Sequence, residues 1–98
     1  MKNKNIYKGS WWFNNRRKHP SFIVKSNNND YFEIKILSHK KTSIYDLKLI
    51  ASPNPEGYGE QYLLFKKYIE NSKKSFGKKL DYKFSKKDKL RTKKWLKK

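Results

Sequence analysis

The sequence predicts a mainly β protein: a small, strongly bent antiparallel barrel of about five strands, followed by a short C-terminal helix. Apolar and polar side chains alternate over several stretches of strand length, and turn-forming residues separate these stretches. A helix-capping sequence followed by a lysine-rich segment marks the helix at the end of the chain. We expect residues 1–98 to form a single domain, because 98 residues leave no room for a separate substrate domain.

The first two predicted strands, 20–26 and 30–38, are expected to pair as a hairpin. Pro20 opens a short apolar run, in keeping with a proline at the start of a strand. Three asparagines and an aspartate separate the two strands and form a strong turn signal. In the second strand, apolar residues occupy one face while Glu33 and Lys35 lie on the other. This period of two predicts a half-buried strand.

Three further strands complete the predicted sheet. A strand is expected over 44–50, and a loop over 52–59, where proline and glycine recur. The segment 62–69 fits a helical face as well as a strand, and its β-rich composition favours the strand. Alternation over 80–84 predicts the last strand, so that all barrel strands lie within 20–84.

The two ends of the chain differ from this alternating pattern. Residues 1–8 are polar and are expected to be a flexible lead-in. At the other end, Ser85 and Asp88 have the spacing of a capping box, in which Asp88 reaches back to the backbone of Ser85. The helix predicted over 85–97 has a thin apolar stripe, so it is expected to dock loosely or to fray.

Composition excludes several classes of protein. The chain has no cysteine, which excludes a disulfide framework and thiolate metal sites. Its two histidines and eight acidic residues show no spacing typical of metal ligands, so we expect no metal and no other cofactor. No apolar run approaches the length of a membrane span, and we expect a cytoplasmic protein without membrane contact. Aromatic residues make up 16% of the chain, which argues against disorder.

The net charge of +18 arises from 26 Lys and Arg against 8 Asp and Glu. It is concentrated at the two ends: residues 1–25 carry +7, residues 26–65 carry −1, and residues 66–98 carry +12. A near-neutral middle between basic ends indicates a folded scaffold that presents cationic surfaces to a polyanion. The sequence therefore predicts a nucleic-acid-binding protein.

Two basic clusters contain the residue types that metal-free phosphate chemistry requires. RNA cleavage by its own 2′-hydroxyl needs a base, cations near the phosphate and an acid for the leaving oxygen. In the first cluster, Arg16 and Arg17 can fork onto phosphate oxygens beside Lys18, and His19 can exchange a proton near neutral pH. The second cluster, at the end of the strand 30–38, consists of Ser38, His39, Lys40, Lys41 and Thr42. Both histidines also fit surface positions without a role.

Further candidates for contact with nucleic acid lie outside these clusters. Trp11 and Trp12 begin an aromatic run that either stacks on bases or fills the core, and the scarcity of other large apolar residues favours the core. The predicted helix offers exposed charge to phosphates through Lys86, Lys87, Lys93 and Lys94.

The layout resembles the PemK/MazF family of toxin endoribonucleases. In that family a loop ends in a basic residue before proline, followed by a short apolar strand that ends in serine, as in 19–26 here. A following strand ends in threonine or serine, here Ser38, and the last strand leads into a serine-capped helix, here 84–88. The departures are His19, where the family has arginine directly before proline, and Ser38 in place of threonine.

The resemblance implies an SH3-like barrel that cleaves RNA without metal. It also implies a homodimer that an acidic antitoxin protein neutralises. The catalytic residues would be Arg17, His19 and Ser38.

Two other interpretations fit the same residues. The first is a non-catalytic RNA- or DNA-binding small barrel protein of a phage or mobile element, which binds with a steep salt dependence. The second is a membrane-active cationic protein, which the alternating strands disfavour.

Overall fold

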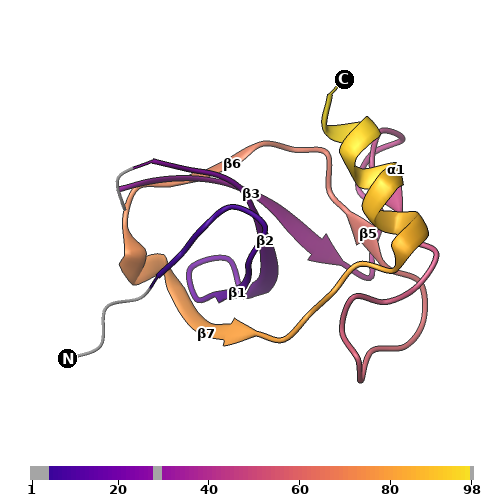
Figure 1. Cartoon of the computed structure of the whole chain (residues 1–98), viewed down its shortest axis with the longest axis horizontal. Coiled ribbons are helices and arrows are strands. Elements are labelled where there is room, and N and C mark those ends of the chain that lie inside the picture. Colours follow the sequence, from indigo (N-terminus) through magenta and orange to yellow (C-terminus); the bar gives the residue numbers. More distant parts are fainter. Residues whose placement is uncertain (1–4, 28–29, 98) are drawn as a thin grey trace.

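The strands form a bent antiparallel sheet of seven strands, in the order β4-β5-β3-β2-β1-β7, with β6 paired to β3 (Figure 1). The computed structural model describes residues 5–27 and 30–97. In chain order the strands are β1 (Trp11–Asn14), β2 (His19–Asn27), β3 (Tyr31–Ser38), β4 (Leu47–Lys48), β5 (Tyr62–Leu63), β6 (Tyr68–Glu70) and β7 (Phe76–Leu80). A short 3-10 turn, η1 (Lys73–Ser75), precedes β7, and the helix α1 (Lys86–Leu96) ends the chain.

The predicted mainly β architecture with a C-terminal helix is confirmed. The sheet is barrel-like, but in the described part of the chain it does not close, because no pairing joins the terminal strands β4 and β7. The predicted hairpin is confirmed as well: β2 pairs with β3 from Ser21 opposite Ile36 to Asn27 opposite Tyr31. The register shifts between Ile23 and Lys25, and a bulge of this kind increases the local twist of a sheet.

β3 is the central strand because it pairs along both edges and has two partners in succession along one of them. One edge pairs with β2, while the other pairs first with β6, where Ile34 lies opposite Tyr68, and then with β5, where Leu37 lies opposite Leu63. A core of buried side chains fills the concave side, including Ile23, Phe32, Ile34 and Phe76.

The aromatic run that begins at Trp11 forms a strand that was not predicted from the sequence. Trp11 and Trp12 fill the core, which is the alternative that the sequence favoured over stacking on bases. Side chains alternate across a strand, so Trp12 joins the cluster around Phe32 while Trp11 joins a second cluster with Leu63 and Trp95. The one strand therefore ties two separate apolar clusters together.

The strand predicted over 44–50 is wrong in extent, since only Leu47–Lys48 pairs and Ile44 is 79% exposed. Before β4, the Asp46 carboxylate accepts hydrogen bonds from the backbone N–H groups of Thr42 and Ser43, which holds this segment in a turn.

The strand predicted over 80–84 lies earlier in the chain, at Phe76–Leu80. Tyr82 and Phe84 continue the alternation and pack against the second cluster. The backbone between them does not join the sheet, because Lys83 donates its N–H to the carbonyl of Pro53 in the loop opposite. Segment 62–69 forms strand rather than helix, as favoured, but residues 64–67 interrupt it.

The helix α1 begins as predicted and is attached at both ends. Ser85 Oγ accepts a hydrogen bond from the N–H of Asp88 at 3.2 Å. The Asp88 carboxylate does not act as predicted: it accepts hydrogen bonds from the N–H groups of Ile50 and Ala51 in the loop after β4. At the other end, the Trp95 indole donates to the carbonyl of Tyr45 at 2.8 Å.

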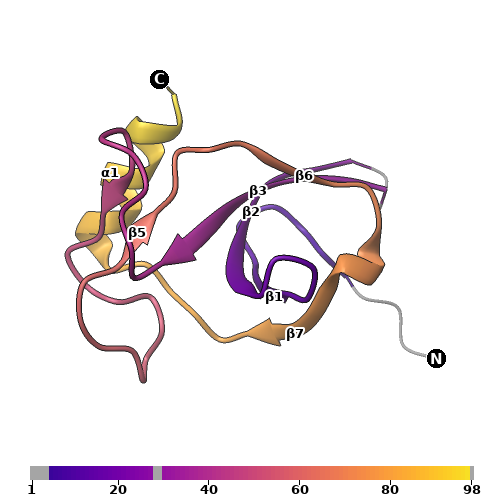
Figure 2. The same cartoon turned by 180° about the vertical axis from the view of Figure 1, so that it is seen from behind.

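Both views show α1 beside β5, while η1 and β7 lie toward the opposite end (Figure 2). In the described residues, no helix is long and apolar enough to cross a membrane.

The lead-in predicted over 1–8 is only partly described, since residues 1–4 lie outside the described residues. Ile6 is buried in the first core cluster. Gly9 donates its N–H to the carbonyl of Ile23, so this part of the chain packs on β2 rather than leading freely into it.

The core predicts that the same substitution, isoleucine to valine, lowers stability at a buried position and not at an exposed one. Ile34 is fully buried, so Ile34→Val should lower the free energy of unfolding by about 0.5–1.5 kcal/mol through loss of packing. Ile44→Val removes the same methylene from an exposed side chain and should leave stability within about 0.5 kcal/mol of wild type. Urea unfolding followed by tryptophan fluorescence measures both, and equal losses would contradict this assignment of the core.

Candidate nucleic-acid interface

A groove of about 920 Å³ runs along α1, between the helix, β2 and the segments around residues 8–11 and 82–84. It is the larger of the two cavities described here. Its base is the aromatic floor, which we define as Trp11, Phe22, Tyr82 and Phe84. Its edges are the lysine rim, which we define as Lys8, Lys83, Lys89, Lys93 and Lys97.

The aromatic floor is a mutually packed cluster rather than four separate rings. The ring centre of Trp11 lies 5.1 Å from that of Phe22 and 5.2 Å from that of Phe84, and Phe22 and Phe84 meet edge to face at 5.0 Å. Trp11 is buried, whereas the other three are partly exposed. Contacts of this kind fix ring orientation, so the floor offers a preformed apolar surface to a ligand.

Three lysines of the lysine rim lie along one side of α1. Lys89, Lys93 and Lys97 are spaced by four residues, which places them one above the other along the helix. Lys8 and Lys83 come from the opposite wall of the groove. The described residues that line the groove include no Asp or Glu, so its positive potential is not neutralised locally.

Thr92 adds a hydrogen-bonding group at the groove. Its residue is 3% exposed, and its hydroxyl is buried without a hydrogen-bond partner among the described residues. Buried polar groups usually have a partner, so this unpaired hydroxyl is an exception within the fold.

The first basic cluster of the sequence is bound to a buried carboxylate. Glu70 is fully buried, and its Oε1 and Oε2 lie 3.0 Å from Arg16 Nη1 and 2.9 Å from Arg17 Nε. Asn14 and Ser75 donate further hydrogen bonds to the same carboxylate. Within the protein, one carboxylate therefore offsets one of the two positive charges that the sequence assigned to this cluster.

The two arginines are held differently. The Arg16 side chain remains 64% exposed, whereas that of Arg17 is 24% exposed and stacks over the ring of Tyr68 at 4.3 Å. Lys18, next in the turn, has a left-handed backbone with φ 61°. His19 is exposed and lies opposite Asn14 in the β1–β2 pairing.

The second basic cluster is organised by local hydrogen bonds. Ser38 Oγ donates to the carbonyl of Lys40 and accepts from its N–H, at 3.1 and 3.0 Å. His39 Nδ1 lies 3.0 Å from the carbonyl oxygen of Glu60. Lys40 and Lys41 are exposed. In the part of the chain that the structure describes, no hydrogen bond or ion pair links His19 or Ser38 to Arg17.

The lysines predicted on the helix are all exposed, and one of them lines the groove. Lys93 belongs to the lysine rim, whereas Lys86, Lys87 and Lys94 do not line it. Lys89 and Lys97 were not predicted as contact residues, although their spacing of four residues from Lys93 is visible in the sequence. Lys8 and Lys83 carry no such signal, because the fold alone brings them to the groove.

Comparison of the chain with protein-family models, with curated proteins and with solved structures gave no match. The resemblance to PemK/MazF endoribonucleases therefore stays a prediction that rests on the residues quoted for it. Among the described residues, no group of three or more histidine or acidic side chains could hold a metal ion.

The Glu70 network predicts a pH dependence of stability. Burial on its own would raise the pKa of Glu70, but hydrogen bonds from Asn14, Ser75 and Arg17 outweigh it and lower the pKa below 4.5. The ionised carboxylate thus stabilises the fold above that pH, and its contribution is lost as the pH falls through the lowered value.

Replacement of the carboxylate should remove both effects. Glu70→Gln should lower the free energy of unfolding at neutral pH by about 2–3 kcal/mol, because the charge-assisted hydrogen bonds disappear. It should also flatten the loss of stability below pH 4.5. Glu56→Gln, a change at an exposed loop residue, is the matched control and should resemble wild type. Denaturant unfolding over a pH series measures both variants, and an unchanged acid dependence in Glu70→Gln would refute this role.

Proposed function

We propose that the protein binds single-stranded nucleic acid, RNA above all, along the groove beside α1. The observation that carries the proposal is the lysine rim over an aromatic floor with no Asp or Glu in the described lining. Phosphates would contact Lys89, Lys93 and Lys97, while unpaired bases would lie against the partly exposed rings of the floor.

Single-stranded ligands suit this groove better than duplexes for two physical reasons. Only unpaired bases present a flat apolar face to aromatic rings, and each such stacked base contributes about 1–3 kcal/mol. A cationic edge releases condensed counterions from the phosphate chain, which adds affinity that does not depend on base sequence.

Binding without turnover is the interpretation that the geometry supports best. The charge of Arg17 is offset by Glu70, and the hydroxyl of Ser38 is engaged with the backbone of Lys40. The toxin-like endoribonuclease, its homodimer and its acidic antitoxin stay predictions from the family resemblance, and the experiments below include cleavage as a readout.

The lysine rim makes a prediction about affinity and salt dependence. The double variant Lys89→Gln/Lys93→Gln should bind a short fluorescent oligouridylate about tenfold more weakly at physiological ionic strength. It should also reduce the slope of log affinity against log salt by about 0.7 for each phosphate that the variant no longer neutralises. Fluorescence anisotropy titrations at several salt concentrations measure both quantities.

A matched pair of lysines separates the groove from general charge. Lys74→Gln/Lys78→Gln removes the same charge from exposed residues at η1 and β7, and neither of these lysines lines the groove. This control should keep most of the affinity. If both double variants lose affinity equally, the groove is not the binding site.

The oligonucleotide itself reports on catalysis. We expect RNA incubated with the protein and a chelator to remain intact on a denaturing gel, because Arg17 and Ser38 are engaged within the fold. Cleavage that survives the chelator and disappears in Arg17→Ala, His19→Ala or Ser38→Ala would instead establish the endoribonuclease.

A further inference from the structure

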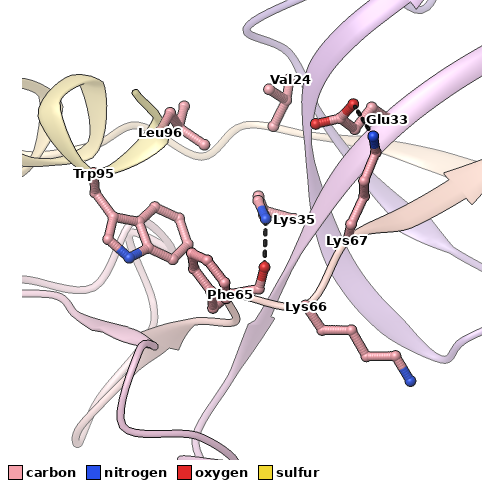
Figure 3. A pocket seen from close by; sticks show the side chains of 8 residues that line it. All are labelled: Val24, Glu33, Lys35, Phe65, Lys66, Lys67, Trp95 and Leu96. Atoms are coloured by element: carbon pink, nitrogen blue, oxygen red, sulfur yellow. Dashed lines mark hydrogen bonds and ion pairs between the residues drawn. The ribbon is translucent and has the colours of Figure 1, made fainter. Parts of the chain in front are cut away.

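A second, smaller cavity of about 290 Å³ lies on the face of β3 that carries Glu33 and Lys35, opposite its apolar face (Figure 3). We call it the Lys35 pocket. The residues that matter for its chemistry are Glu33, Lys35, Phe65, Lys67, Trp95 and Leu96. The last turn of α1 and the segment after β5 cover this face, which the alternating pattern of the strand alone could not reveal.

Lys35 is buried although its amine has no carboxylate partner in direct contact among the described residues. The residue is 8% exposed, and Nζ donates a hydrogen bond to the carbonyl oxygen of Phe65 at 2.6 Å. The amine also lies 5.3 Å from the ring centres of both Phe65 and Trp95. Figure 3 shows the two rings next to each other and the amine to one side of both.

The charges around this amine come from three segments. Glu33 lies on β3 and forms an ion pair with Lys67 at 3.5 Å, and Lys66 lies next to Lys67 on the pocket wall. Asp46 lies before β4. Burial, aided by the charge of Lys67, lowers the pKa of Lys35 below 10.5 against the opposing effect of Glu33 and Asp46.

We propose that Lys35 is a carbonyl-reactive amine, and that the Lys35 pocket takes small aldehydes that form an imine with it. In its deprotonated form, an amine that donates one N–H to the Phe65 carbonyl keeps its lone pair for attack, so the observed hydrogen bond orients the nucleophile without blocking it. The rings of Trp95 and Phe65 give an apolar wall that suits an aromatic aldehyde.

The reaction balances with groups present in the pocket. The lone pair of Nζ attacks the carbonyl carbon, a C–N bond forms, and the π electrons move to oxygen, which takes a proton from the Lys67 ammonium. The Glu33 carboxylate takes a proton from the nitrogen. Glu33 then returns its proton to the hydroxyl group, which leaves as water while the C=N bond forms. The remaining proton on the nitrogen passes back to Lys67, which gives the imine. No oxidant or metal is consumed.

Reductive trapping tests the proposal on the whole protein. The folded chain is treated at neutral pH with limiting benzaldehyde and sodium cyanoborohydride, and the benzylated residues are mapped by peptide mass spectrometry. We expect Lys35 to be labelled at least about fivefold more than a typical exposed lysine, because its amine is desolvated and lies in a cavity. In protein unfolded in urea this preference should disappear, since both features depend on the fold.

Two variants complete the test. Lys35→Met should abolish the fast phase of labelling, whereas Lys25→Met, which removes an exposed lysine outside the pocket, should keep it. If Lys35→Met does not fold, the site-resolved labelling of the wild type still decides. Even labelling across exposed lysines, or preference for Lys66 or Lys67, would overturn the proposal. The result does not depend on nucleic-acid binding, which the oligouridylate titration measures separately.

Discussion

The placement of α1 depends on one buried carboxylate. Asp88 is fully buried in the first turn of the helix, where it accepts hydrogen bonds from the N–H groups of Ile50 and Ala51 and pairs with Arg91 at 2.6 Å. A negative charge at this end also complements the helix dipole. Because the two amides lie in the loop after β4, the carboxylate joins the helix to a segment 37 and 38 residues away. The groove and the Lys35 pocket both lie along this helix, so both depend on this anchor.

The sequence predicted strands well where alternation and turn signals came from residues that also pair with each other in the sheet. The hairpin of β2 and β3 combines alternation with a strong turn, and both signals are local. Alternation elsewhere did not distinguish a paired strand from an extended segment that packs by its side chains. Leu80, Tyr82 and Phe84 all pack against one cluster, yet only Leu80 belongs to β7. Pairing depends on what lies opposite, which the local pattern does not contain.

The candidate site was predictable only in part, for a related reason. The excess of basic residues and the exposure of Lys93 follow from composition and helix periodicity. The hydrogen bonds of Arg16 and Arg17 to Glu70 span more than fifty residues, so the local sequence could not show that one carboxylate offsets part of the charge of that cluster. Likewise, Lys35 looks like a solvent-facing strand residue until α1 is placed over it. In a chain with few acids, the positions of its buried carboxylates therefore decide which cations remain available.

Because the sheet is not closed, the abundant lysines also affect how its edge strands meet other chains. Among the described residues, β4 pairs only with β5 and β7 only with β1, and open edges of this kind can recruit a second chain. One edge, β4, is only two residues long and carries Lys48, while the other, β7, carries exposed Lys78 and Lys79. Charge repulsion between like edges opposes edge-to-edge stacking, so the cationic surface also protects the protein from aggregation.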